Sequence, residues 1–165
     1  MVLIGMLHVH KRQRQRGNAI LESALIMGPM FMMLFAIVDF SVAILVKNTL
    51  QAAVREGVRY AITGQTASGA GGQDNSIKQV VQAYSLGFLT TTNANLISIT
   101  YYNPATLTSV SGTNSNAAGN IVQVSVTGFS WAWMVPYARS ATPLQISVAS
   151  ADVVEPSPNG VPPTR

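Results

Sequence analysis

The side chains that could carry acid–base or metal chemistry are few in this sequence. The chain of 165 residues has no cysteine, and its two histidines, His8 and His10, lie within the first ten residues. Its six carboxylates are spread along the chain without a paired-carboxylate motif. Most of the chain therefore has neither a thiolate nor an imidazole for nucleophilic, general-base or metal chemistry. The sequence predicts a protein that is not an enzyme, with no catalytic residue, no metal site and no cofactor.

The positive charge of the chain is concentrated in one short run near the N-terminus. The net charge is +4 and the isoelectric point is about 9.8, values that could indicate nucleic-acid binding. Four of the ten Lys and Arg residues, however, occur within six positions: Lys11, Arg12, Arg14 and Arg16. The most apolar part of the sequence follows, which is typical of a membrane orientation signal. No nucleic-acid partner is expected.

An apolar segment from Ser23 to Val46 is long enough to cross a membrane. It has 24 residues and one formal charge, that of Asp39. As a helix it would rise about 36 Å, against a hydrocarbon core of about 30 Å. The basic run before it predicts a cytoplasmic N-terminus and an extracytoplasmic C-terminus. A cleaved secretory signal is the alternative, but its apolar stretch would be only about 7–15 residues long, and no convincing cleavage site follows.

One carboxylate stands at the start of this apolar segment. Glu22 directly precedes Ser23 and is the fifth residue after Gly17. An ionised carboxylate in a membrane is costly, so such a residue needs a partner and is a functional candidate. The alternative is an ordinary first-turn glutamate, which the positive end of the helix dipole stabilises.

With these features the sequence resembles the type IV pilin superfamily, and more closely the TadE-like pseudopilins of tight-adherence (Flp, type IVc) pilus systems. That family combines a short basic leader ending in glycine, a glutamate as the fifth residue after it, an apolar helix with an early proline, and a later acidic residue. The matching residues here are Gly17, Glu22, Pro29 and Asp39, followed by an Ala- and Arg-rich run over residues 51–61. The resemblance extends over about residues 16–65.

The resemblance implies processing and assembly. A prepilin peptidase, which is a membrane aspartate protease, would cut between Gly17 and Asn18 and remove the basic leader. The new ammonium group of Asn18 would then pair with the Glu22 carboxylate, in the same chain or between neighbouring subunits. The implied partners are the prepilin peptidase, other pilins or pseudopilins, the inner-membrane assembly platform and membrane lipid.

Two further residues of the apolar segment are candidate assembly positions. Pro29, preceded by Gly28, predicts a kink or a loosened turn, because proline frees a backbone carbonyl. Such a turn could serve the packing of subunits in a filament, or it could be a kink that the membrane helix accommodates without a function. Asp39 would lie about 24 Å along the helix from Ser23, near the outer interface. It could reach polar headgroups there, or contact another subunit or the assembly platform.

Beyond Val46 the period of the apolar residues predicts an α+β domain. A helical period continues from Leu50 to Ala61 and ends at Thr63-Gly64. It returns over residues 77–84, which predicts a second helix that residues 74–76 could cap. Strict alternation then predicts three strands around residues 97–101, 122–126 and 144–148. The predicted fold is a long N-terminal transmembrane helix that continues into a small pilin-like domain with a second helix and a three-stranded antiparallel sheet.

Three segments of the outer domain lack a regular pattern. The Gly-rich stretch 68–72 lacks the Gly-Lys-Ser/Thr end of a phosphate loop and is expected to be a linker. The aromatic segment Phe129–Tyr137 is expected to pack on the sheet or the helix, with membrane anchoring or binding of a sugar or a partner as alternatives. The Pro-rich segment 156–165 is expected to be flexible or extended.

The predicted organisation is a leader (1–17), a transmembrane helix (18–46), an extracytoplasmic pilin-like domain (47–155) and a flexible tail (156–165). The predicted function is that of a pseudopilin or minor pilin that prepilin peptidase processes and that takes part in assembly of a tight-adherence-type pilus or a related secretion filament. It would cross the bacterial inner membrane once and could enter an extracellular pilus. The alternative is an uncleaved, single-pass, membrane-anchored extracytoplasmic binding protein.

Overall fold

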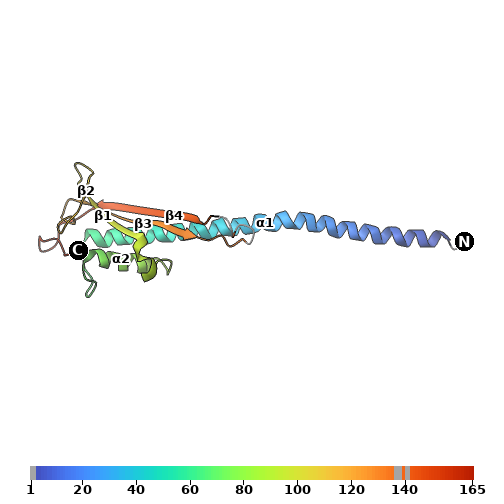
Figure 1. Cartoon of the computed structure of the whole chain (residues 1–165), viewed down its shortest axis with the longest axis horizontal. Helices are drawn as coiled ribbons and strands as arrows, with labels where there is room; N and C mark the ends of the chain where they lie inside the picture. Colours follow the sequence, from blue (N-terminus) through green and yellow to red (C-terminus); the bar gives the residue numbers. More distant parts are fainter. Residues whose placement is uncertain (1–2, 136–138, 140–141) are drawn as a thin grey trace.

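One long helix forms the axis of the molecule. The computed structural model describes residues 3–135, 139 and 142–165, with side chains from residue 19 onward, and helix α1 runs from Leu3 to Ile62. Figure 1 shows the other elements gathered along the C-terminal half of α1, while its N-terminal half projects alone. These elements are α2 (Gln73–Tyr84), the 3-10 helix η1 (Thr91–Leu96), β1 (Ile97–Tyr102), β2 (Ser109–Val110), β3 (Ile121–Trp131) and β4 (Leu144–Val153).

The C-terminal half of α1 is amphipathic, and its apolar face packs against the domain. Its buried residues recur at three- and four-residue spacing in one stripe: Ala43, Val46, Leu50, Ala53, Val54, Gly57, Val58 and Ala61. This confirms the helical period predicted between Leu50 and Ala61. The helix ends at Ile62, just before the predicted stop, and Gly64 there has a φ of 65° that glycine adopts without penalty.

The sheet is antiparallel, with the strand order β2-β1-β3-β4. The three predicted strands are present, and each is longer than its alternating pattern indicated. The predicted number of strands is wrong by one, because the two-residue strand β2 pairs Val110 with Tyr101 at the edge. A strand of two residues has no alternation to detect, so the sequence pattern could not reveal it.

An irregularity in β3 turns an aromatic residue into the core. The register of β3 against β4 shifts between Val126 and Phe129. Gly128 lies in this bulge with a φ of 71°, a conformation that suits glycine. Phe129 is consequently buried and packs edge-on against Phe88, with ring centroids 6.3 Å apart.

The hydrophobic core lies between α1, α2 and one face of the sheet. Alternate residues of β3 point into it, and Val122, Val124 and Val126 are fully buried. Gly57 of α1 allows the two helices to pack closely, since a methyl group in its place would overlap the side chain of Val81 on α2. The absence of a side chain at this position is therefore a packing requirement.

The start of α2 differs from the prediction. Residues 74–76 do not cap the helix, which begins at Gln73 after Gly72 and has no side-chain cap. The hydroxyl of Ser76 instead donates to the carbonyl oxygen of Gly72 at 2.8 Å, from within the first turn. Gln73 Nε2 donates to the carbonyl oxygen of Ala61 at 3.0 Å, so the start of α2 is tied to the end of α1.

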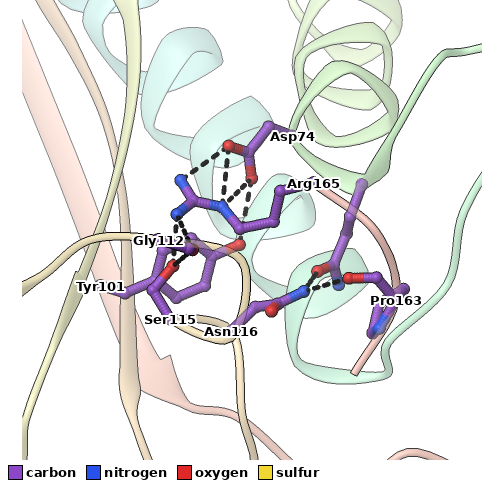
Figure 2. A network of polar contacts seen from close by, with 8 residues as sticks. Asp74, Tyr101, Gly112, Ser115, Asn116, Pro163 and Arg165 are labelled. Carbon is purple, nitrogen blue, oxygen red and sulfur yellow. Dashed lines mark hydrogen bonds and ion pairs between the residues drawn. The ribbon is translucent and has the colours of Figure 1, made fainter. Parts of the chain in front are cut away.

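The segment 156–165 forms no helix or strand and includes a turn at residues 158–161, and its end is anchored to the domain (Figure 2). The Arg165 guanidinium forms a bidentate ion pair with Asp74 of α2, with Nη2 at 2.8 Å and Nε at 3.1 Å from Oδ2. The same group donates to the carbonyl oxygen of Gly112 and to the hydroxyl of Ser115, and lies 4.6 Å from the centroid of the Tyr101 ring. A flexible tail was expected from the composition, but these contacts hold its end in place.

Backbone carbonyls before Arg165 add to this anchor. The carbonyl oxygen of Thr164 accepts the N–H of Gln73 at 2.8 Å. That of Pro163 accepts a hydrogen bond from Asn116 Nδ2, also at 2.8 Å. Proline cannot donate from its nitrogen but still accepts through its carbonyl, so a proline-rich segment can be held by donors on the domain.

The same contacts shift the ionisation of Tyr101. Burial raises the pKa of Tyr101 most, followed by the negative charge of Asp74, whose Oδ1 accepts the tyrosine hydroxyl at 3.2 Å. Arg165 opposes this shift. The hydrogen bond to Asp74 also raises the pKa of Arg165.

Candidate functional site: the exposed apolar helix and its junction with the domain

The N-terminal half of α1 exposes apolar side chains on all sides. From Ala19 to Val38 every side chain is exposed except that of Ala36, which is half-buried. These 20 residues rise about 30 Å, which equals the thickness of a hydrocarbon core. The helix is long and apolar enough to cross a membrane, with a mean hydropathy of 2.3 in its most apolar part. The structure thus fits a single-pass membrane anchor.

The hydroxyl groups in and next to this stretch are satisfied by the helix itself. Ser23 Oγ donates to the carbonyl oxygen of Ala19 at 2.8 Å, and Ser41 Oγ donates to that of Ile37 at 2.7 Å. Hydrocarbon offers no hydrogen-bond partner, so a hydroxyl bonded within its own helix is less costly to insert. These serines are compatible with a position in lipid.

The predicted leader and cleavage position lie within α1. The helix begins at Leu3 and therefore includes the basic run Lys11–Arg16 and the bond between Gly17 and Asn18. The side chains of these residues are outside the described part of the structure. The sequence alone did not predict a helical leader.

Glu22 lies on the exposed surface of α1 among apolar side chains. Its neighbours Leu21 and Leu25 are 70% and 79% exposed. With the helix inserted in a membrane, a carboxylate in this position faces lipid, headgroups or another protein. The geometry therefore leaves open the pairing that the sequence predicts for it.

Helix α1 runs through Pro29 without interruption. The expected loosening of a turn does not break the helix. At the preceding Gly28, an added Cβ would meet nothing within 4 Å, so this side of the helix is open. Small residues on an open helix surface allow another helix to approach closely in a membrane.

Asp39 is buried at the point where the domain first meets α1. It is 2% exposed, and its two oxygens accept backbone N–H groups of the loop after β3. Oδ1 accepts from Met134 at 2.9 Å and Oδ2 from Val135 at 3.0 Å. The sequence predicted a headgroup, subunit or platform contact for this residue. In the structure, both oxygens of its carboxylate accept hydrogen bonds from backbone N–H groups of the same chain.

The loop bound by Asp39 places an aromatic side chain on α1. Trp133 packs edge-on against Phe40, with ring centroids 5.8 Å apart, and its Nε1 donates to the carbonyl oxygen of Thr142 at 3.2 Å. The predicted packing of the aromatic segment on a helix is thereby confirmed for Trp133, while Phe129 packs against Phe88 in the segment after α2. Tyr137, which belongs to the same predicted cluster, is outside the described residues.

The candidate residues of α1 remain separated along the helix. Glu22 and Asp39 are 17 residues apart, which is about 26 Å along the axis, and Pro29 lies between them. Within one chain they cannot form a common site. Glu22 and Asp39 lie near the two ends of the exposed apolar stretch Ala19–Val38.

These features indicate an α+β, pilin-like fold: a long helix, apolar and exposed over its first half, carries a domain with an antiparallel sheet on its second half. A protein-family model described as TadE-like protein matches residues 17–59. The resemblance predicted from the sequence is thus confirmed over this segment, which includes Glu22, Pro29 and Asp39. No curated protein and no solved structure matches the chain.

The match associates the chain with tight-adherence pilus systems and with pilus components in general. Proteins of this family are structural rather than catalytic. The long apolar helix α1 fits a single-pass membrane anchor in such a protein.

Two contacts were not predicted from the sequence. The partners of Asp39 are backbone N–H groups, which every residue except proline carries, so no residue type marks them. The ion pair between Asp74 and Arg165 joins residues 91 positions apart. Its only sequence signal was a single cation at the end of the Pro-rich segment.

Proposed function

We propose that the protein is a pseudopilin or minor pilin that prepilin peptidase processes and that takes part in assembly of a tight-adherence-type pilus or a related secretion filament. The proposal depends above all on the stretch Ala19–Val38, whose apolar side chains are not covered by the domain. Such a helix is stable in lipid or packed among other helices. The TadE-like match, which begins at the predicted last residue of the leader, supports the same function.

Processing would occur between Gly17 and Asn18. The basic run Lys11–Arg16 would hold this bond at the cytoplasmic surface. The bond lies in α1, so the peptidase needs the helix to unwind locally. Glycine favours this, because it costs a helix about 1 kcal/mol relative to alanine. Cleavage leaves six Lys and Arg against six Asp and Glu, so the charges that fixed the orientation are gone.

Glu22 would be paired on assembly. After cleavage the Asn18 ammonium lies four residues away on the same helix, or opposite Glu22 in a neighbouring subunit. An opposite charge within about 4–6 Å favours the ionised carboxylate and offsets its loss of hydration. The driving force for assembly would be the exchange of lipid contacts for helix–helix contacts, with Pro29 and the open surface at Gly28 in the middle of the packed stretch.

The proposed topology places residues 1–17 in the cytoplasm, a membrane-spanning helix within residues 18–46, and a pilin-like domain outside the inner membrane. Contact between α1 and the domain begins at Asp39, so the part of the helix that is free to face lipid on all sides ends near Val38. Asp39 would act in assembly through the loop that it holds. The partners would be the prepilin peptidase, other pilins and the assembly platform.

Complementation of a strain that lacks the protein tests this function. We expect the wild-type chain to restore pili, and Gly17→Val and Glu22→Ala to fail. An immunoblot should show the unprocessed size for Gly17→Val and the mature size for Glu22→Ala. Glu155→Ala removes an exposed carboxylate of the outer domain and should behave as the wild type. Normal piliation by both variants of α1 would favour an uncleaved membrane-anchored binding protein.

A further inference from the structure

A groove opens where α1 leaves its lipid-facing stretch. It has a volume of about 260 Å³ and lies between α1 and the start of β4. Its α1 side is formed by residues on one helix face, and its other side by the first four residues of β4. The lining residues are Phe40, Ala43, Ile44, Lys47, Leu144, Gln145, Ile146 and Ser147, none of which is acidic.

The groove begins at the level of lipid headgroups and extends away from the membrane. With Ala19–Val38 in the hydrocarbon core, Phe40 is about 3 Å and Ile44 about 9 Å beyond its edge. The headgroup layer on each side of a bilayer is about 5–8 Å thick. Phe40 and Ile44 are 58% and 57% exposed, so the apolar surface of the helix continues from the lipid-facing stretch into the groove.

Donors line the part of the groove farther from the membrane. Lys47 is exposed, and helix side chains lean toward the N-terminus, so its long side chain can bring the ammonium group back to the headgroup layer. Strand β4 is the edge of the sheet, and its Ala149 carbonyl accepts a hydrogen bond from Gln51 of α1 at 3.0 Å. Because strand residues two apart direct their backbone groups to the same side, the N–H groups of Gln145 and Ser147 also face this edge.

We propose that the groove binds the headgroup of an anionic membrane phospholipid. The phosphate would lie at the Lys47 ammonium and the edge N–H groups of Gln145 and Ser147, and the acyl chains would follow Phe40 and Ile44 into the bilayer. The volume is below the roughly 300–1,000 Å³ of sites that enclose a drug-sized ligand, so the groove suits a headgroup whose chains stay in the membrane.

The chemistry of the lining favours a lipid over a helix of a second copy. A second lipid-facing helix would bring apolar side chains, which cannot use a cation and two backbone donors. A lipid phosphate uses all three, and no carboxylate of the lining competes with it. The bound lipid would fix the height and rotation of the domain on the membrane. The inference rests on the membrane position of α1 in the proposed function, but not on processing or filament assembly.

Native mass spectrometry of the full, unprocessed chain in detergent tests the inference, with an equimolar mixture of phosphatidylglycerol and phosphatidylcholine as the probe. We expect one phosphatidylglycerol to be retained in preference to phosphatidylcholine. Lys47→Ala should lower this retention about fivefold, the effect of one cation near an anionic lipid surface. Lys78→Ala makes the same charge change on α2, away from the groove, and should leave retention unchanged.

A second variant tests the groove at its apolar side. Ile44→Glu places a carboxylate at an exposed position of the groove and should abolish the preference for phosphatidylglycerol. Equal retention of the two lipids by the wild type, or equal losses in Lys47→Ala and Lys78→Ala, would overturn the inference. So would a dimer without lipid whose abundance depends on Lys47, which would assign the groove to a second copy. If the wild-type chain restores pili but retains the two lipids equally, the lipid site is refuted and the proposed function is not.

Discussion

Replacement of Asp39 by asparagine should release the loop after β3 from α1. The buried carboxylate accepts the N–H groups of Met134 and Val135 at 2.9 and 3.0 Å. An asparagine would keep one acceptor and turn its NH₂ group toward the second donor. Hydrogen bonds to charged groups contribute about 1.5–3 kcal/mol each, so the free energy of local opening should fall by about 2–3 kcal/mol.

Amide hydrogen exchange of the full chain in detergent measures this local opening. Each loss of about 1.4 kcal/mol speeds exchange tenfold, so the amides of Met134 and Val135 should exchange roughly 30- to 150-fold faster in Asp39→Asn. Asp152→Asn is the matched control, since Asp152 also accepts a backbone N–H, that of Val153 at 2.8 Å, but is exposed. Unchanged exchange of Met134 and Val135 in Asp39→Asn would refute the role of the carboxylate as the anchor of this loop.

Three other perturbations test the packing of the domain. Because folding raises the pKa of Tyr101, its contribution to the free energy of unfolding is full below about pH 10, where the phenol of the unfolded chain ionises, and falls above that pH. Thermal melts at increasing pH should show this loss in the wild type but not in Tyr101→Phe. In urea unfolding, Arg165→Ala should cost about 1–2 kcal/mol, whereas Arg59→Ala, whose 3.9 Å ion pair is exposed, should cost less than about 0.5 kcal/mol. Gly57→Ala should cost about 1–3 kcal/mol because it overlaps a valine of α2, whereas Gly28→Ala, with open space around it, should be tolerated in the same assay.

The main elements of the fold could be predicted because their apolar periods are strong. The stripe from Leu50 to Ala61 and the alternation from Val122 to Val126 both follow from burial of one face, and both are buried as expected. Details that depend on a few residues were missed. Strand β2 is too short for a period, and the bulge at Gly128 extends β3 beyond the point where the simple alternation stops.

The candidate site could be predicted where its signal is local. Gly17, Glu22, Pro29 and Asp39 form an ordered pattern along one helix, and the family match covers all four. The contacts of Asp39 could not be predicted, because its donors are backbone groups 95 and 96 residues away. Only the fold brings them to the end of the exposed apolar stretch Ala19–Val38.

Intact-mass measurement of the chain from membranes that contain a prepilin peptidase tests most directly whether it is processed as a pilin subunit. The expected N-terminus is Asn18, with the mass of residues 1–17 lost, and the same chain should begin at Met1 when the peptidase is absent. A chain that still begins at Met1 in the presence of the peptidase, or one that is cut after Val46 like a secretory signal, would contradict the proposed function.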